Sequence, residues 1–290
     1  LIVSKIKGLK EILPTLVGNY QKPISTPLED RRPSSQTCEK CHSSEMFFGD
    51  IPQIAVSYAA DIANTRSTDT RVLKVGGGRQ QVSAGIHWHA TGKVWYLALD
   101  GQRLGMAWLA TQDADGKITQ YLDPQRISQV TPELIQNNAR QMDCIDCHNR
   151  VTHLFQSPEQ LIDVALTDGS IDVKLPFIKQ QAMNALVPQN ASIEQAEAKV
   201  AQIREFYRSY PETFQTKQAS IDQAIGKLNE IARLTIFPDG LDWKTYQDNS
   251  NHDKPDIEGT VDFAAIAAKD QSAGCFRCHG NMIKANVTGM

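Results

Sequence analysis

All six cysteines of the chain fall in one repeated pattern, in which two cysteines are separated by two residues and followed directly by a histidine. The three copies are Cys38–His42, Cys144–His148 and Cys275–His279. Histidine accounts for only 7 of the 290 residues. Three histidines placed in this way have a chance probability of roughly one in 10⁵ on composition alone. The histidine therefore belongs to the motif, and the chemistry of the motif has to use it.

Three familiar kinds of site explain the cysteine spacing but not the histidine. Disulfides, zinc ribbons and thioredoxin-like redox pairs all use Cys-x-x-Cys. Zinc takes four ligands, so ribbons need the pairs two by two, and one of three pairs is left over. Attachment of c-type haem explains all three copies, because two thiols bond two vinyl groups and the histidine binds the iron. The sequence therefore predicts three covalently bound haem c groups.

This chemistry assigns nine residues to the haems. The residues expected to form thioethers are Cys38, Cys41, Cys144, Cys147, Cys275 and Cys278. The residues expected to bind the irons on the proximal side are His42, His148 and His279. Haem attachment to this motif takes place outside the cytoplasm, so we expect a periplasmic or extracellular protein of a prokaryote. An export signal or membrane anchor that precedes Leu1 is compatible with this location.

Histidines outside the motifs are candidates for the distal side of the irons. They are His87, His89, His153 and His252. If the first two lie on a strand, both face one side and Trp88 faces the other. Two such close histidines rarely serve two irons, so we favour His89 as a ligand and His87 as its neighbour. Met46 and Met282 are weaker candidates.

We expect His153 to bind the iron of a haem other than its nearest one. It follows His148 by five residues, and each residue extends by about 3.3–3.6 Å. A segment this short scarcely reaches round the porphyrin edge to the opposite face. His153 is therefore assigned to a neighbouring haem, and His252 is expected to be a further distal ligand.

The composition fits a folded protein that is 41% hydrophobic and 22% charged. The net charge of −3 gives no support to nucleic-acid binding, which needs a concentrated basic face. No stretch approaches the roughly 18 apolar residues that span a bilayer. In residues 1–17, apolar side chains recur at helical spacing with lysines between them. This segment fits either a membrane or membrane-subunit contact, or packing on the protein's own core.

We expect an α+β fold, with the haems bound in loop-rich junctions. Residues 1–52 hold the amphipathic segment, a proline-rich linker and the first motif. Residues 53–125 form a β-rich module of four to six antiparallel strands, among them 94–99, 104–111 and 118–122. Residues 126–236 hold the second motif and a helical scaffold, with helices starting at Ser157 and Ser192 and one over 173–186. Residues 237–290 hold the third motif.

Several stretches resemble the multihaem cytochromes of the NapC/NirT class. The most specific is CIDCHNRVTHLFQSPEQLIDVAL, which starts at Cys144. The resemblance implies a protein that passes electrons from membrane quinol towards periplasmic reductases, anchored by an N-terminal helix. In the quinol-oxidising members, a methionine lies two residues after the first motif. Here Met46 lies four residues after His42.

We expect a trihaem electron-transfer protein and not an enzyme, acting in a respiratory or photosynthetic chain. Its partners are expected to be redox proteins or copies of itself, and no nucleic acid. Two alternatives stay open. One is a multihaem oxidoreductase with one open iron, and the other is a subunit of an extracellular cytochrome filament.

Overall fold

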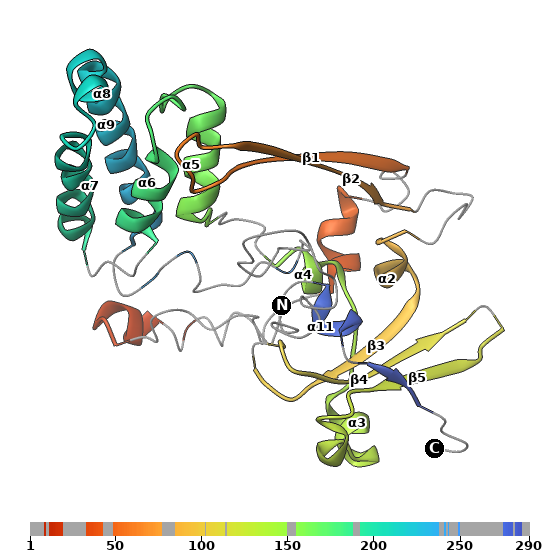
Figure 1. Ribbon diagram of the computed structural model, residues 1–290. Coiled ribbons are helices and arrows are strands. Elements are labelled where there is room, and N and C mark those ends of the chain that lie inside the picture. Colours follow the sequence, from red (N-terminus) through yellow and green to blue (C-terminus); the bar gives the residue numbers. More distant parts are fainter. Residues whose placement is uncertain are drawn as a thin grey trace.

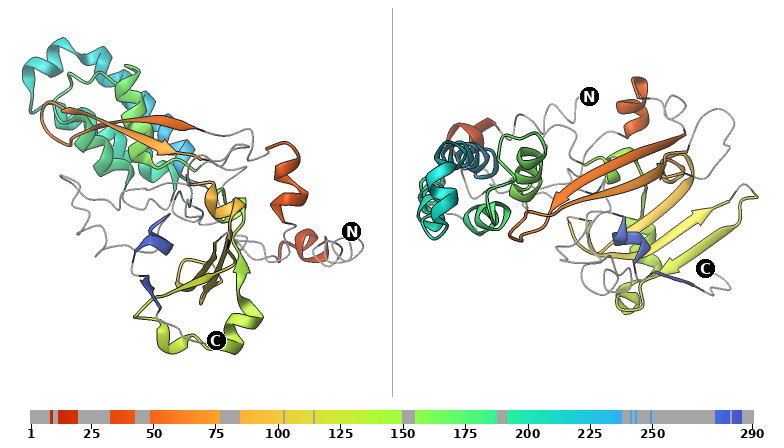
Figure 2. Two further views of the ribbon diagram at one scale, coloured as in Figure 1. Left: turned by 90° about the vertical axis from the view of Figure 1, so that its right-hand side faces the viewer. Right: turned by 45° about the horizontal axis from the view of Figure 1, so that its top comes forward.

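The computed structural model describes most of the chain. The described residues are 9, 12–19, 33–42, 49–76, 85–101, 103–113, 115–149, 155–187, 192–237, 241, 243, 249, 275–280 and 282–285. They form helices and antiparallel sheets, with helices α5 to α9 at one end and strands β3 to β5 at the other (Figures 1 and 2). Within these residues, no helix is both long enough and apolar enough to cross a membrane.

A five-stranded antiparallel sheet holds the middle and the end of the chain together. Its strands are β3 (Lys93–Ala98), β4 (Met106–Gln112), β5 (Ile118–Leu122), β6 (Arg140–Gln141) and β7 (Ile283–Lys284), in the order β6-β3-β4-β5-β7. The three inner strands are rich in aromatic and aliphatic side chains, which favour a pleated and half-buried surface. They confirm the strands predicted over 94–99, 104–111 and 118–122.

Different side chains pack on the two faces of this sheet. Alternate side chains point to opposite faces of a strand. Leu97 and Trp108 face helix α3 (Pro132–Asn138), which contributes Leu134 and Ile135 to the packing. On the other face, the buried cluster consists of Val94, Tyr96, Met106, Leu109 and Met142. Cys278 packs against this second cluster, so that face carries part of the third motif.

A long hairpin lies between the sheet and the helices. Strands β1 (Asp50–Tyr58) and β2 (Arg66–Lys74) pair in antiparallel register. Nine residues at about 3.3 Å each give the hairpin a length of about 30 Å. It runs from the neighbourhood of α5 to the short helix α2 (Trp88–Thr91), as Figure 1 shows. The segment 53–125 therefore supplies strands to two separate sheets.

The helical scaffold has its own core. It consists of α5 (Pro158–Thr167), α6 (Ile178–Leu186), α7 (Ile193–Tyr207), α8 (Pro211–Thr216) and α9 (Gln218–Thr235). The fully buried side chains include Ile162, Ile178, Val200, Ile221 and Leu228. This core also contains Tyr58, from the end of β1. The scaffold and the hairpin are therefore packed as one unit.

Local sequence signals set the starts of two scaffold helices as predicted. The Ser157 hydroxyl accepts a hydrogen bond from Gln160 N at 3.2 Å, and the Gln160 side chain accepts one from Ser157 N at 3.0 Å. This is a complete capping box. The Ser192 hydroxyl caps α7 in the same way, by accepting a bond from Gln195 N at 3.3 Å.

Helix α6 begins later than predicted. The helix expected over 173–186 starts at Ile178. The residue before it, Phe177, has a φ of 59°, in the left-handed region that a helix cannot continue through. Residues 171–177 instead form turns that bury Ile171 and Leu175 in the scaffold core.

Asn64 fixes the tip of the hairpin to the scaffold. It adopts a φ of 49°, which asparagine tolerates better than most residues, and its side chain is 1% exposed. Its amide nitrogen donates to Val173 O at 2.9 Å and to Leu175 O at 2.8 Å. Its carbonyl oxygen accepts from Lys179 N at 2.9 Å. One side chain thus joins the hairpin to two scaffold segments.

We predict that Asn64→Ala lowers the free energy of unfolding by about 2–4 kcal/mol, because two carbonyls and one amide lose their buried partner. Chemical denaturation followed by far-ultraviolet circular dichroism measures this change. The control Asn184→Ala alters an exposed position on α6 and is expected to change stability by less than about 0.5 kcal/mol. Equal stability of the two variants would show that Asn64 does not anchor the hairpin.

Candidate functional site

The three Cys-x-x-Cys-His motifs fold into the same helical turn. They lie in the 3₁₀ turn η2 (Cys38–Lys40) and in the short helices α4 (Cys144–Cys147) and α11 (Phe276–His279). In each turn the histidine amide donates to the carbonyl of the first cysteine. The distances are 2.8 Å for His42 to Cys38, 2.8 Å for His148 to Cys144 and 3.0 Å for His279 to Cys275.

This turn presents two thiols and one imidazole on one side. Side chains three and four positions apart share a face of a helix. In every motif the second cysteine lies three positions after the first, and the histidine lies four positions after it. The three proximal histidines are all exposed. The donor set therefore fits covalent attachment of a porphyrin, with an imidazole directed at its iron.

The structure disfavours disulfides and a bare metal ion at these motifs. None of the six cysteines is paired in a disulfide. Within the described part of the chain, no three or more histidine, cysteine, aspartate or glutamate side chains come together in an arrangement that holds a metal ion. The pairing of two Cys-x-x-Cys motifs around one zinc is therefore not found.

The thiol pKa values also differ from those of a redox pair. Burial raises the pKa of Cys147 to about 11 and that of Cys278 to about 12, although the nearby Arg277 guanidinium opposes the change. Burial also raises the pKa of Cys144 and of Cys275. The reactive cysteines of thioredoxin-like sites have lowered pKa values, because the thiolate is the nucleophile. These four thiols are shifted in the opposite direction.

The first motif contacts the second through the residues around it. Ser34, in the 3₁₀ turn η1 (Ser34–Gln36), donates its amide to Asp143 Oδ2 at 2.8 Å. Asp143 is also the N-cap of α4. Glu39, inside the first motif, accepts a weak contact from the Cys144 thiol at 4.0 Å. The first turn therefore lies against the start of the second.

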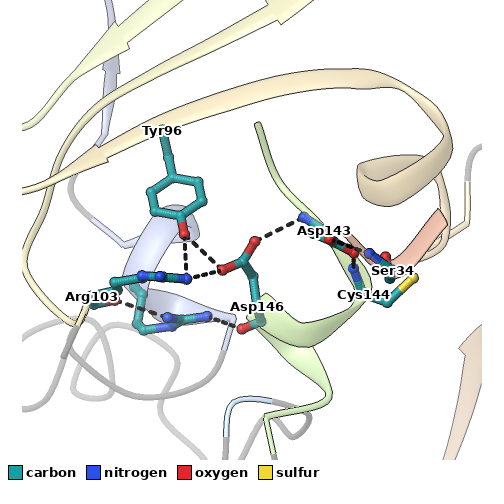
Figure 3. Close-up of polar contacts among 7 residues, drawn as sticks. Ser34, Tyr96, Arg103, Asp143, Cys144 and Asp146 are labelled. Carbon is teal, nitrogen blue, oxygen red and sulfur yellow. Dashed lines mark hydrogen bonds and ion pairs between the residues drawn. The ribbon is translucent and has the colours of Figure 1, made fainter. Parts of the chain in front are cut away.

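The second motif contacts the third through a buried polar network centred on Asp146 (Figure 3). Asp146 Oδ1 accepts hydrogen bonds from Tyr96 Oη at 2.7 Å and from Arg103 Nη1 at 3.1 Å. Its Oδ2 atom accepts from Asp143 N at 2.8 Å. Arg277, in the third motif, donates to Asp146 O at 2.8 Å and to Arg103 O at 2.9 Å.

The charges in this network are nearly inaccessible to water. Asp146 is 6% exposed, Arg277 is 7% exposed and Arg103 is 8% exposed. Burying a charge is costly unless it is paired and hydrogen-bonded. Desolvation and the Asp146 charge both raise the pKa of Tyr96, so its hydroxyl stays a hydrogen-bond donor at neutral pH. The network therefore favours one relative placement of the second and third turns.

The two edge strands of the five-stranded sheet hold the second and third motif turns in place. Strand β6 pairs with β3 and leads into Met142, whose amide donates to Val94 O at 2.8 Å. The second motif follows at once. Strand β7 pairs with β5 and comes shortly after the third motif. The second and third turns thus lie beside each other, next to one sheet (Figure 1).

The three motifs therefore gather at one place, although they are widely separated in the sequence. The second motif contacts both of the others. Charged residues that the sequence analysis did not single out make these contacts. Asp146 and Arg277 hold the same position in two copies of the motif, but Arg277 bonds the backbone carbonyl of Asp146, so their charges gave no signal for this contact.

One distal candidate lies next to a motif histidine. The ring centroids of His89 and His279 are 5.7 Å apart. The condition that His87 and His89 lie on a strand is not met, because residues 88–91 form helix α2 and His87 is its N-cap. The amide of Gly92 donates to Trp88 O at 2.6 Å and closes this turn. The two histidines therefore do not share a face in the expected way.

The remaining candidates for the distal side of the irons include one methionine that the structure describes and three residues that it does not. Met282 is half-buried and packs against the sheet cluster that includes Met142 and Cys278. His153, His252 and Met46 lie outside the described residues, so their assignments stay predictions.

Comparison with known proteins gives one informative match. No family model matches the chain, and no solved structure matches it. The chain is 34% identical over 290 residues to the cytochrome c-type protein ImcH of Geobacter sulfurreducens (strain ATCC 51573 / DSM 12127 / PCA). The match covers 99% of this chain and 54% of that protein, so the chain spans about half the length of this curated relative. The homology supports a c-type cytochrome, a class that binds haem c covalently outside the cytoplasm.

We predict that Asp146→Asn lowers the free energy of unfolding of the haem-loaded protein by about 3–5 kcal/mol. The amide leaves the buried Arg103 without its countercharge and places an N–H group where an oxygen accepted hydrogen bonds. Denaturant titration monitored by haem absorbance measures the loss. Asp115→Asn, at an exposed turn, is the control and should change stability by less than about 0.5 kcal/mol. If the two variants unfold alike, the network does not hold the turns together.

Proposed function

We propose that the chain is a trihaem c-type cytochrome that relays electrons between redox partners on the periplasmic or extracellular side of a prokaryotic membrane. The observation that carries the proposal is the gathering of three identical Cys-x-x-Cys-His turns around the second motif. The similarity to a cytochrome c-type protein supports the same class. The NapC/NirT-like stretches support a place in a respiratory chain.

The chain's own residues attach and orient the haems in this proposal. Each pair of thiols would hold one porphyrin, and His42, His148 or His279 would bind its iron. The bound haem would supply one-electron redox chemistry. Electron transfer weakens steeply with distance, so contacts that hold the turns together favour a relay. The second motif contacts both others, and this supports the order first, second, third along the relay.

In this proposal the buried network holds the second and third motif turns close together and takes no part in the redox chemistry itself. Arg277 bonds a backbone carbonyl of the second turn, and Asp146 bonds Tyr96 of the sheet. Both turns are thereby tied to the same rigid element. We infer that the protein moves electrons without substrate chemistry of its own, since three motif histidines and several further histidines suffice to fill three irons.

We predict that the purified protein carries three haems, all six-coordinate and low-spin. Intact mass and pyridine haemochrome absorbance count the haems, and optical and electron paramagnetic resonance spectra report the spin state. The reduced protein should not bind carbon monoxide. His148→Ala serves as the positive control, since it opens one iron while all thioethers remain. Fewer than three haems, or carbon monoxide binding by the unaltered protein, would contradict the proposal and the latter would favour an enzyme.

The N-terminal segment is the proposed contact with a membrane or a membrane subunit. Its described apolar side chains, Leu9, Ile12, Leu13, Leu16 and Val17, are 50–77% exposed. This exposure at the described positions supports a contact with a membrane or partner over packing on the protein's own core, which is the other interpretation of residues 1–17. Exposed apolar side chains at helical spacing, interleaved with lysines, suit a lipid headgroup boundary or a partner helix.

We predict that deleting residues 1–17 leaves the haem spectrum unchanged and releases the protein from the membrane fraction. The double variant Leu13→Ser/Leu16→Ser should weaken membrane retention in the same direction. Ile54→Ser is the matched control, because Ile54 and Leu13 are both 68% exposed. Cell fractionation followed by haem staining measures the distribution. Loss of haem from the deletion variant would place the segment in the folded core instead.

A further inference from the structure

The imidazole rings of His89 and His279 come from two different parts of the fold and contact each other in a T-shaped arrangement. His279 belongs to the third motif, on α11, whereas His89 belongs to no motif and lies on α2. Their ring centroids are 5.7 Å apart, and the ring planes are inclined by 87°. The contact joins a residue before β3 to a residue before β7, so tertiary structure alone brings the two imidazoles together.

The separation of the two rings suits two imidazoles that share one metal ion. A metal–imidazole bond is about 2.0–2.1 Å long, on the values known for zinc. Each ring centroid lies about 1.1–1.2 Å beyond the binding nitrogen, so two imidazoles on opposite sides of one ion have ring centroids roughly 6.3–6.5 Å apart. The observed 5.7 Å is shorter than that separation by less than about 1 Å. The two rings would therefore have to move apart by less than about 1 Å to share an iron.

A hydrogen bond at Nδ1 of His89 leaves Nε2 as the ring nitrogen that can bind a metal. Its Nδ1 atom lies 2.9 Å from Ile86 O. A carbonyl oxygen only accepts hydrogen bonds, so Nδ1 carries the proton and donates it. In the neutral ring, Nε2 then has a free lone pair. A hydrogen bond from the second ring nitrogen to a backbone carbonyl is the usual support of a metal-binding histidine.

The backbone holds α2 firmly in this position. The amides of Ile86 and His87 donate to Lys74 O at 2.8 Å and to Val75 O at 3.0 Å, at the end of β2. Gly85 lies so close to this strand end that an added Cβ would meet the backbone of Gly76 and Val75 at 2.2–2.4 Å. Only glycine fits there. The approach of α2 to the end of the hairpin is therefore set by two backbone hydrogen bonds and by a position that only glycine fits.

We propose that His89 Nε2 is the second axial ligand of the third haem, opposite His279. The inference rests on the proposed function, because it needs a haem at Cys275 and Cys278. It assigns one distal histidine to one iron. A histidine gives a lower reduction potential than a methionine in the same place. The third haem is thereby a low-potential centre of the relay, and its potential depends on a helix attached to the β1–β2 hairpin.

The test uses the full haem-loaded chain. His89→Ala is expected to convert one of the three haems from low-spin to high-spin, to allow it to bind carbon monoxide when reduced, and to leave the haem mass unchanged. Added imidazole should restore the low-spin spectrum. His89→Met should keep all haems six-coordinate and raise the reduction potential of one haem. His87→Ala, two positions away, is the matched control and should leave all three haems low-spin.

A double variant identifies the haem. His279→Ala and His89→Ala each affect one haem, and the double variant should still affect only one, because both residues serve the same iron. Two affected haems in the double variant would overturn the assignment to the third haem. A fully low-spin His89→Ala protein with three haems would overturn the ligand role but leave the proposed function intact. An unaltered chain without covalent haem would overturn the proposed function itself.

Discussion

One buried carboxylate determines how the second and third motif turns lie relative to the sheet. Asp146 sits inside the second motif, accepts a hydrogen bond from Tyr96 of β3 and forms an ion pair with Arg103 at 3.1 Å. Its backbone carbonyl accepts the guanidinium of Arg277 from the third motif. Buried charges persist only where every partner is in place. The two turns, the sheet and the loop of Arg103 are therefore interdependent.

The backbone at Arg103 shows how far the fold accommodates this network. Arg103 has a φ of 58°, which is uncommon for any residue other than glycine, asparagine or aspartate. In this conformation its side chain reaches Asp146 while its own carbonyl accepts Arg277. Two contacts with two motifs outweigh the local cost of the left-handed backbone. An unfavourable local conformation is kept because the tertiary structure requires it.

Sequence alone predicted the features that depend on local signals. The motif spacing indicated haem attachment, the capping residues Ser157 and Ser192 marked helix starts, and alternating apolar residues marked β3 to β5. The edge strands β6 and β7 have two residues each, which is too short for any periodicity. The helix at residues 88–91 depends on hydrogen bonds to the end of β2, so its short sequence did not indicate a helix. The contact between the second and third motifs left no trace in the sequence, because Arg277 bonds the backbone carbonyl of Asp146.

The pairing of β7 with β5 also affects how the protein folds. Ile283 and Lys284 come from the end of the described chain, yet they pair with Leu122 and Tyr121 from its middle. Such non-local pairings form slowly, because a long loop has to close before any contact compensates for the lost entropy. Until then, the outer edge of β5 exposes unpaired amide and carbonyl groups, which can template association with another chain. Strand β7 therefore covers this edge of β5 only after a long loop has closed, and by pairing there it removes a site for association with another chain.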